Sequence, residues 1–227
     1  MVNSSTNEMT LWLMPGAPTR LPSSIVVVGP SSALQVWVGG ENGTISMLDP
    51  ATNTFRDWAI PTAGGSSILN IAVASDGSVI FHDALNNTIG LLNPATNIIR
   101  QWRVPTTNSY PVEVAVLSPG VAAFTEQFGN RIGTLNLSAT PNQETAVAPT
   151  IMTVTPAVQV VSPKITTLAK TITTVTPTVT GASRVVTGGF VEYIVPTQNS
   201  FPAGLATDSN RGILFAEAAG NKIGLLQ

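Results

Sequence analysis

Acidic side chains recur at one position of a repeated pattern in this sequence. Asp83, Glu126 and Glu217 each follow a large aromatic residue by two positions, and Gly39 takes this place in the first copy. If the copies surround an axis, the three carboxylates could converge and bind a hard cation such as Mg²⁺ or Ca²⁺ through oxygen ligands. The alternative is that each carboxylate accepts hydrogen bonds within its own copy. We favour this second interpretation and expect no cofactor.

The sequence has one histidine, His82, directly before Asp83. In a strand, His82 would point to the opposite face from its two neighbours, and a lone histidine there is typically a hydrogen-bonded structural residue. His82 and Glu126 are therefore weak candidates for a catalytic base and acid. No nucleophile elbow, phosphate-binding loop, dinucleotide loop or zinc-ligand spacing occurs. We predict no catalytic residue, and the sequence leans against an enzyme without deciding the matter.

The composition bounds the class of protein. Charged residues make up 10% of the chain, the formal net charge is −2 and there is no cysteine, which argues against nucleic-acid binding and excludes disulfides. No apolar run is long enough for a transmembrane segment, and the N-terminal residues lack the basic start and apolar run of a signal peptide. We expect a mature extracellular or cell-surface protein. Asn-X-Ser/Thr sites make it a candidate glycoprotein, and they lie at Asn3, Asn42, Asn86 and Asn136.

The elements that must position these residues repeat about every 44 residues. One landmark is an isoleucine that begins a strand, at Ile45, Ile89, Ile132 and Ile223. A second is an aromatic-x-apolar-Pro strand, which begins at Trp12, Trp58, Trp102 and Tyr193. Each full unit contains four short β-type segments separated by turn residues. This pattern predicts an all-β protein, a β-propeller of about four blades, with each unit as one blade.

The two ends of the chain carry incomplete units. Residues 9–15, "MTLWLMP", match a fourth strand, whereas residues 202–227 match only the first three strands of a unit. We therefore predict that the N-terminal strand completes the last blade and closes the ring. Closure would hide the sheet edges that an open stack exposes.

A Thr/Val/Pro-rich segment interrupts the third unit. It divides the chain into a first propeller part at 1–140, an insertion or arm at 141–188 and a last propeller part at 189–227. Because the segment lacks every blade landmark, we favour an insertion over an eroded fifth blade. Its Val/Thr alternation is strongly β-forming, so it could add strands to a protein partner or to a second copy of the chain. The alternative, which the sequence leaves equally open, is a disordered or glycosylated loop.

The repeats resemble those of the virginiamycin B lyase (streptogramin lyase) family. The match is carried by "FTEQFGNRIGTLN" (124–136) and "FVEYIVPTQNSFPAGLATDSNRGILFAEAAGNKIGLL" (190–226), and it leaves out the insertion. The resemblance implies a β-propeller. It also implies a lyase that opens a cyclic depsipeptide at its ester, using Mg²⁺, histidine and a carboxylate. One histidine cannot supply a two-histidine arrangement, so no catalytic residue is carried over.

Two functions follow from the sequence. The first is a non-catalytic extracytoplasmic β-propeller that acts as a binding or assembly module of a surface or a filament, with residues 141–188 mediating contacts. The alternative is a metal-dependent enzyme of the streptogramin lyase type that opens a cyclic ester.

Overall fold

The computed structural model describes residues 2–3, 8–16, 21–62, 65–160, 184–208 and 212–227. These residues form β-strands, apart from turns and one 3-10 turn, η1, at Ser31–Ala33. Among them no helix is long and apolar enough to cross a membrane. The prediction of an all-β protein is confirmed.

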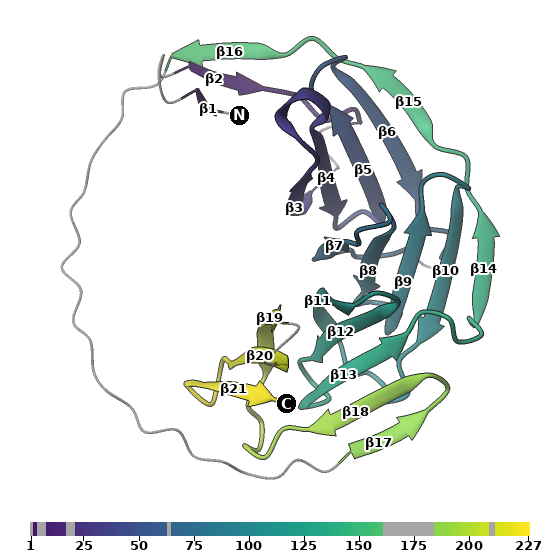
Figure 1. Ribbon diagram of the computed structural model, residues 1–227, viewed down its shortest axis with the longest axis vertical. Helices are drawn as coiled ribbons and strands as arrows, with labels where there is room; N and C mark the ends of the chain where they lie inside the picture. Colours follow the sequence, from purple (N-terminus) through teal and green to yellow (C-terminus); the bar gives the residue numbers. More distant parts are fainter. Residues whose placement is uncertain (1, 4–7, 17–20, 63–64, 161–183, 209–211) are drawn as a thin grey trace, which may run out of the picture.

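Four blades follow one another around an arc (Figure 1). Blade 1 contains β3 (Pro22–Val28), β4 (Gln35–Gly40), β5 (Thr44–Asp49) and β6 (Thr54–Ala59). Blade 2 contains β7 (Ile71–Val73), β8 (Val79–Asp83), β9 (Thr88–Asn93) and β10 (Ile98–Arg103). Blade 3 contains β11 (Pro111–Ser118), β12 (Val121–Glu126), β13 (Arg131–Asn136) and β18 (Phe190–Ile194). Blade 4 contains β19 (Pro202–Asp208), β20 (Gly212–Glu217) and β21 (Lys222–Leu226).

The Ile-Gly landmark is explained by an aromatic ring that lies on the glycine. Gly133 of β13 is paired with Phe124 of β12, and a Cβ atom built on Gly133 would lie 2.1 Å from Cζ of that ring. Gly90 and Gly224 meet the rings of Phe81 and Phe215 in the same way. The third strand therefore needs a residue without a side chain at this position.

The hydrophobic core lies between the blades. One buried cluster joins Ile80 and Ile89 of blade 2 to Val114 and Phe124 of blade 3, and all four side chains are at most 3% exposed. Equivalent clusters connect blade 1 to blade 2 and blade 3 to blade 4. Blades 2 and 3 therefore bury one face against the preceding blade and the other against the following blade.

A tryptophan on the outer strand of blade 1 fixes that blade to blade 2. The indole nitrogen of Trp58 donates to Oδ1 of Asn97, 3.1 Å away in the turn before β10. Trp12 contacts Asn53 of blade 1 in the same way, at 2.8 Å. Both asparagines have a positive φ, which their short polar side chains tolerate. The segment around Trp12 therefore takes the place of an outer strand that precedes blade 1.

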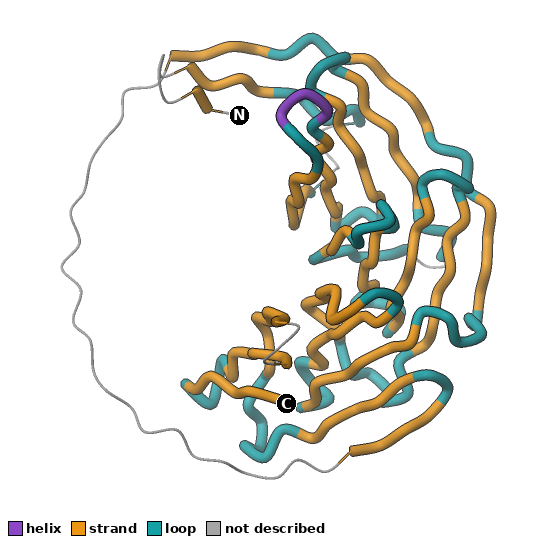
Figure 2. Tube along the Cα trace, viewed as in Figure 1, coloured by secondary structure: helices purple, strands orange, loops and turns teal. Residues whose placement is uncertain are grey.

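The insertion forms strands on blades that are already present. β14 (Gln143–Ala146) pairs with β10, β15 (Thr150–Thr153) pairs with β6, and β16 (Ala157–Val160) pairs with the N-terminal β2 (Glu8–Leu11). We call β14, β15 and β16 the outer belt, since they run along the outside of the arc with short loops between them (Figure 2). Beyond residues 161–183, which lie outside the described part, β17 (Arg184–Thr187) adds a fifth strand to blade 3.

The loops of the outer belt are attached to the turns of the blades beneath them. The amide of Val147 donates to the carbonyl of Asn97 at 2.7 Å, and Val154 donates to Asn53 at 2.9 Å. The same two turns accept the tryptophan indoles. Among the described residues the insertion makes no sheet of four strands, so the structure has four blades with an insertion and not five blades.

The predicted closure of the ring by the N-terminal strand is wrong for the described residues. β2 pairs with β1 (Val2–Asn3) on one edge and with β16 on the other, while the described pairing of β21 is with β20. Figure 1 shows β2 and β21 at opposite ends of the arc. The physical reason is that the clusters between blades fix the rotation from one blade to the next, and four blades do not complete a turn.

Candidate functional site

The three predicted carboxylates lie where the second strand of a blade ends. Asp83, Glu126 and Glu217 close β8, β12 and β20, and their exposed fractions are 0%, 0% and 6%. Each belongs to a different blade. In the described part of the chain, no three histidine, cysteine or acidic side chains come together as a group that could hold a metal ion. The structure therefore does not bring the three carboxylates together.

Asp83 braces the connection between blades 1 and 2. Its Oδ1 accepts from the amide of Ser67 at 3.1 Å, and its Oδ2 accepts from Nδ2 of Asn86 at 2.7 Å. The same Nδ2 donates to the carbonyl of Gly65 at 2.7 Å. These bonds hold the incoming connector against the blade, which is the local role that the alternative interpretation predicted.

Glu126 has the electrostatic character of an acid catalyst but lies inside the protein. Burial, and next the nearby charge of Glu192, raise its pKa to about 8, against the opposing effects of Ser109 and Arg131. Glu192 accepts hydrogen bonds from the amide and the hydroxyl of Thr106, at 3.0 and 3.1 Å. Glu126 is therefore protonated at neutral pH, where it has no exposed surface with which to touch a substrate.

His82 is equally remote from solvent. It is fully buried in β8, and burial lowers its pKa to about 3, with an opposing contribution from the backbone of Val112. The imidazole is therefore neutral across the physiological range. As a base it would have to act on a molecule that had entered the interior of the blade.

The carboxylate position in blade 1 differs by one residue from the sequence prediction. Gly40 pairs with Thr44 as Asp83 pairs with Thr88, so Gly40 and not Gly39 takes the carboxylate place. The turn between β4 and β5 is one residue shorter than the matching turn of blade 2. The aromatic residue and the landmark isoleucine are equally far apart in the sequence of both blades, which concealed this shift, because the isoleucine lies beyond the turn.

Two asparagines that the sequence analysis did not single out join the blades by four hydrogen bonds each. Nδ2 of Asn130 donates to the carbonyls of Val195 and Thr197, at 3.0 and 2.9 Å. Its Oδ1 accepts from both the amide and the hydroxyl of Ser200, each at 2.8 Å. Asn87 binds Ser109 and the carbonyls of Val104 and Thr106 in the same way. The signal in the sequence was the recurring Asn two residues before the landmark isoleucine.

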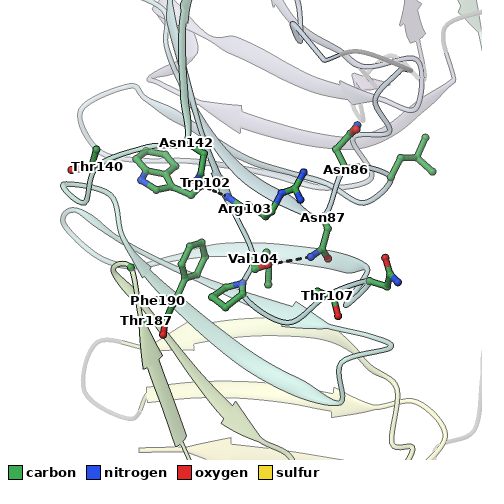
Figure 3. A pocket seen from close by; sticks show the side chains of 14 residues that line it. Asn86, Asn87, Trp102, Arg103, Val104, Thr107, Thr140, Asn142, Thr187 and Phe190 are labelled. Atoms are coloured by element: carbon green, nitrogen blue, oxygen red, sulfur yellow. Dashed lines mark hydrogen bonds between the residues drawn. The ribbon is translucent and has the colours of Figure 1, made fainter.

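A polar pocket of about 550 Å³ lies between blade 2 and the β17–β18 turn (Figure 3). Its lining is rich in amides and hydroxyls, including Asn86, Asn87, Thr107 and Asn142. Several of these groups are already in use, because Oδ1 of Asn142 accepts from the amide of Arg103 at 2.7 Å. The pocket offers room for a small polar molecule without a charged pair or a reactive side chain aimed into it.

A second pocket, of about 600 Å³, is apolar and lies between β2 and blade 1. We call it the blade-1 groove. Its walls are formed by Leu11, Trp12, Ile25, Val27 and Phe55, among others. Ile25 and Val27 are 67% and 54% exposed, so this face of the blade is uncovered within the described structure.

Comparison with known proteins places this fold. No family model and no curated protein matches the chain. Among solved structures, it is similar to catalytically inactive virginiamycin B lyase from Staphylococcus aureus with quinupristin, at 21% identity and a TM-score of 0.52, covering 97% of this chain and 71% of that one. A streptogramin B lyase structure is similar at 17% identity and a TM-score of 0.53, covering 99% of this chain and 72% of that one. The fold resembles that of the virginiamycin B lyase propellers.

The expected resemblance to this family is confirmed at the level of the fold. At such identities the likeness carries no catalytic residue to this chain.

The four glycosylation candidates differ in accessibility. Asn42 and Asn136 are exposed, and Oδ1 of Asn136 accepts from the amide of Ser138 at 2.9 Å. Nδ2 of Asn86 is committed to Asp83 and Gly65, so a glycan there would break both bonds. The side chain of Asn3 lies outside the described residues.

Proposed function

We propose that this protein is a non-catalytic β-propeller that acts as a binding or assembly module, with the insertion mediating contacts. The observation that carries the proposal is the outer belt. Its strands pair with the outer strands of blades 1 and 2 and with β2, and strand addition of this kind is a general mode of protein recognition. The belt in turn presents its own outer edge.

The exposed surface of the insertion suits a protein contact. Ile151, Val158 and Val186 are 62%, 60% and 64% exposed, and they lie on β15, β16 and β17. Exposed β-branched residues on edge strands favour pairing with a further strand. We therefore propose that a partner adds to the outer belt or to β17.

The burial of the acidic groups and of the histidine supports a non-catalytic role. A lyase of the streptogramin type would need its base and acid to reach a substrate, and neither Glu126 nor His82 has exposed surface. We also propose, from composition and acceptor sites, that the protein works outside the cytoplasm, at a cell surface or in a secreted form.

Sedimentation velocity on the purified chain tests the assembly proposal. The variant combines Ile151→Lys with Val186→Lys, because lysine on an edge strand opposes strand addition. The control is Leu85→Lys, at a residue that is 64% exposed and lies outside the insertion. We expect the belt variant to form smaller assemblies than the parent and the control. Equal association of all three proteins would refute a contact role for the insertion.

A chemical assay tests the alternative. The chain is incubated with Mg²⁺ and a cyclic depsipeptide that contains an ester, and the product is followed by mass spectrometry. We expect no ring-opened product. A product that disappears in a folded Glu126→Gln variant would establish the lyase function instead.

A further inference from the structure

We propose that the two ends of the arc are complementary halves of one blade-to-blade interface, and that a second copy of this chain occupies each of them. The occupant of blade 4 is β2 and blade 1 of the other copy. This inference goes beyond the proposed contact of the insertion, because its surface is formed by β21, β2 and blade 1.

Blade 4 presents the face that other blades bury against their successor. Ile45, Ile89 and Ile132 are at most 1% exposed, whereas Ile223, at the same place on β21, is 79% exposed. Leu225 on the same strand is 49% exposed. The edge of β21 is also open in the described structure, where the first three blades have an outer strand.

An outer strand that paired with β21 would have a defined chemistry. Ile45 is paired with Trp58, Ile89 with Trp102 and Ile132 with Tyr193, so each landmark isoleucine faces the aromatic residue of an outer strand. By the same pairing, the strand that fits beside Ile223 is one with the aromatic-x-apolar-Pro signature. The chain carries this signature at Trp12-Leu13-Met14-Pro15, directly after β2, whose described neighbours are β1 and β16.

Blade 1 presents the opposite half of the interface. The pairing of β3 with β4 places Ile25 where Ile71 and Val114 lie in blades 2 and 3. Ile71 and Val114 are 2% and 3% exposed because each packs on a preceding blade, whereas Ile25 is 67% exposed in the blade-1 groove. The surface that a preceding blade should cover is thus bare.

Joining the two halves repeats contacts that the chain already makes between its own blades. In the register of the other blades, Trp12 of one copy faces Ile223 of the other, and Leu13 faces Lys222. The edge of β2 that would receive β21 is the one opposite β16. In the described structure β1 pairs there with Glu8 and Met9 only, and β21 of the other copy would displace it. Two copies joined at both ends place eight blades in one ring, which is the upper end of the usual number of propeller blades. The two head-to-tail contacts between the copies then form a closed dimer.

The mass of the purified 227-residue chain in solution is the first test. We expect a dimer of the 23.6 kDa chain by light scattering. Ile223→Asp and Ile25→Asp alter exposed side chains, so both should fold, and each should weaken association by about thirty-fold or more, as loss of a central apolar contact does. Leu85→Asp, at an exposed site away from both ends, is the matched control and should remain dimeric.

Mixing the two variants tests the head-to-tail geometry. Ile223→Asp leaves the blade-1 end intact, and Ile25→Asp leaves the blade-4 end intact, so the mixture should form dimers through one sound junction. Failure of the mixture to associate would overturn the proposal.

Cross-linking decides between two copies and closure within one chain. The sequence has no cysteine, so Leu13→Cys with Lys222→Cys introduces a unique pair. On oxidation we expect a covalent dimer; a cross-link within one chain, or a monomer, would overturn the proposal. Association that is lost in Ile151→Lys with Val186→Lys but kept in Ile223→Asp would refute this interface while leaving the proposed assembly function standing.

Discussion

Replacement of Asn130 measures how strongly the turn asparagine joins one blade to the next. In Asn130→Ala the four hydrogen bonds to Val195, Thr197 and Ser200 are lost. Ser200 has no exposed surface, so its amide and hydroxyl would be left without these partners inside the protein. A buried polar group without a partner costs about 1–3 kcal/mol, and several are affected.

Backbone strain adds to this cost. Asn130 has a φ of 53°, and alanine in the left-handed region costs about 1–2 kcal/mol. We therefore expect Asn130→Ala to lower the free energy of unfolding by about 3–5 kcal/mol, a large part of the stability of an ordinary domain. Asn130→Gly removes the same bonds without the strain, so it should recover about 1–2 kcal/mol of the loss.

The chain supplies a matched control at Asn221. This residue takes the same place in blade 4 with a φ of 50° and is exposed. Asn221→Ala should therefore cost only the backbone strain, about 1–2 kcal/mol. Urea unfolding followed by circular dichroism, with a protein concentration series, gives the three values. Equal losses for Asn130→Ala and Asn221→Ala would refute the assignment of stability to the bonds between blades.

Three further predictions concern blade 3 and the belt. Since the pKa of Glu126 is raised to about 8 in the folded protein, the folded state holds a proton that the unfolded state releases above about pH 4.5, and stability falls as pH rises from there through 8. Glu126→Gln should abolish this part of the fall in the urea midpoint; an unchanged difference between parent and variant across that window would contradict the buried acid. Gly133→Ala puts a methyl group 2.1 Å from the ring of Phe124 and should cost about 1–3 kcal/mol, whereas Gly204→Ala, whose nearest contact is at 3.8 Å, should be nearly neutral. Glu144→Ala breaks an ion pair whose side chains are about half exposed and should change stability by less than about 1 kcal/mol in thermal unfolding.

Much of the fold could be predicted because repetition is visible in the sequence. The landmark isoleucines and outer-strand aromatics gave the number of blades, and the absence of those landmarks at 141–188 marked the insertion. The position of the carboxylates at the end of the second strand could also be predicted, and Asp83 accepts hydrogen bonds from Ser67 and Asn86 there. What failed was the register of blade 1, because a turn shortened by one residue moves Gly40 into the place assigned to Gly39.

The sequence by itself determined the local elements, since turn asparagines, strand residues and glycines act on their immediate neighbours. Only the tertiary structure decided where the ends lie and what the insertion does. Ring closure depends on the rotation between blades, which the packing of side chains such as Phe124 and Ile89 sets. The outer belt depends on strand edges that are distant in sequence, as β14 and β15 pair with β10 and β6. Neither quantity is written in any local pattern, because both arise from surfaces that exist only after the blades have formed.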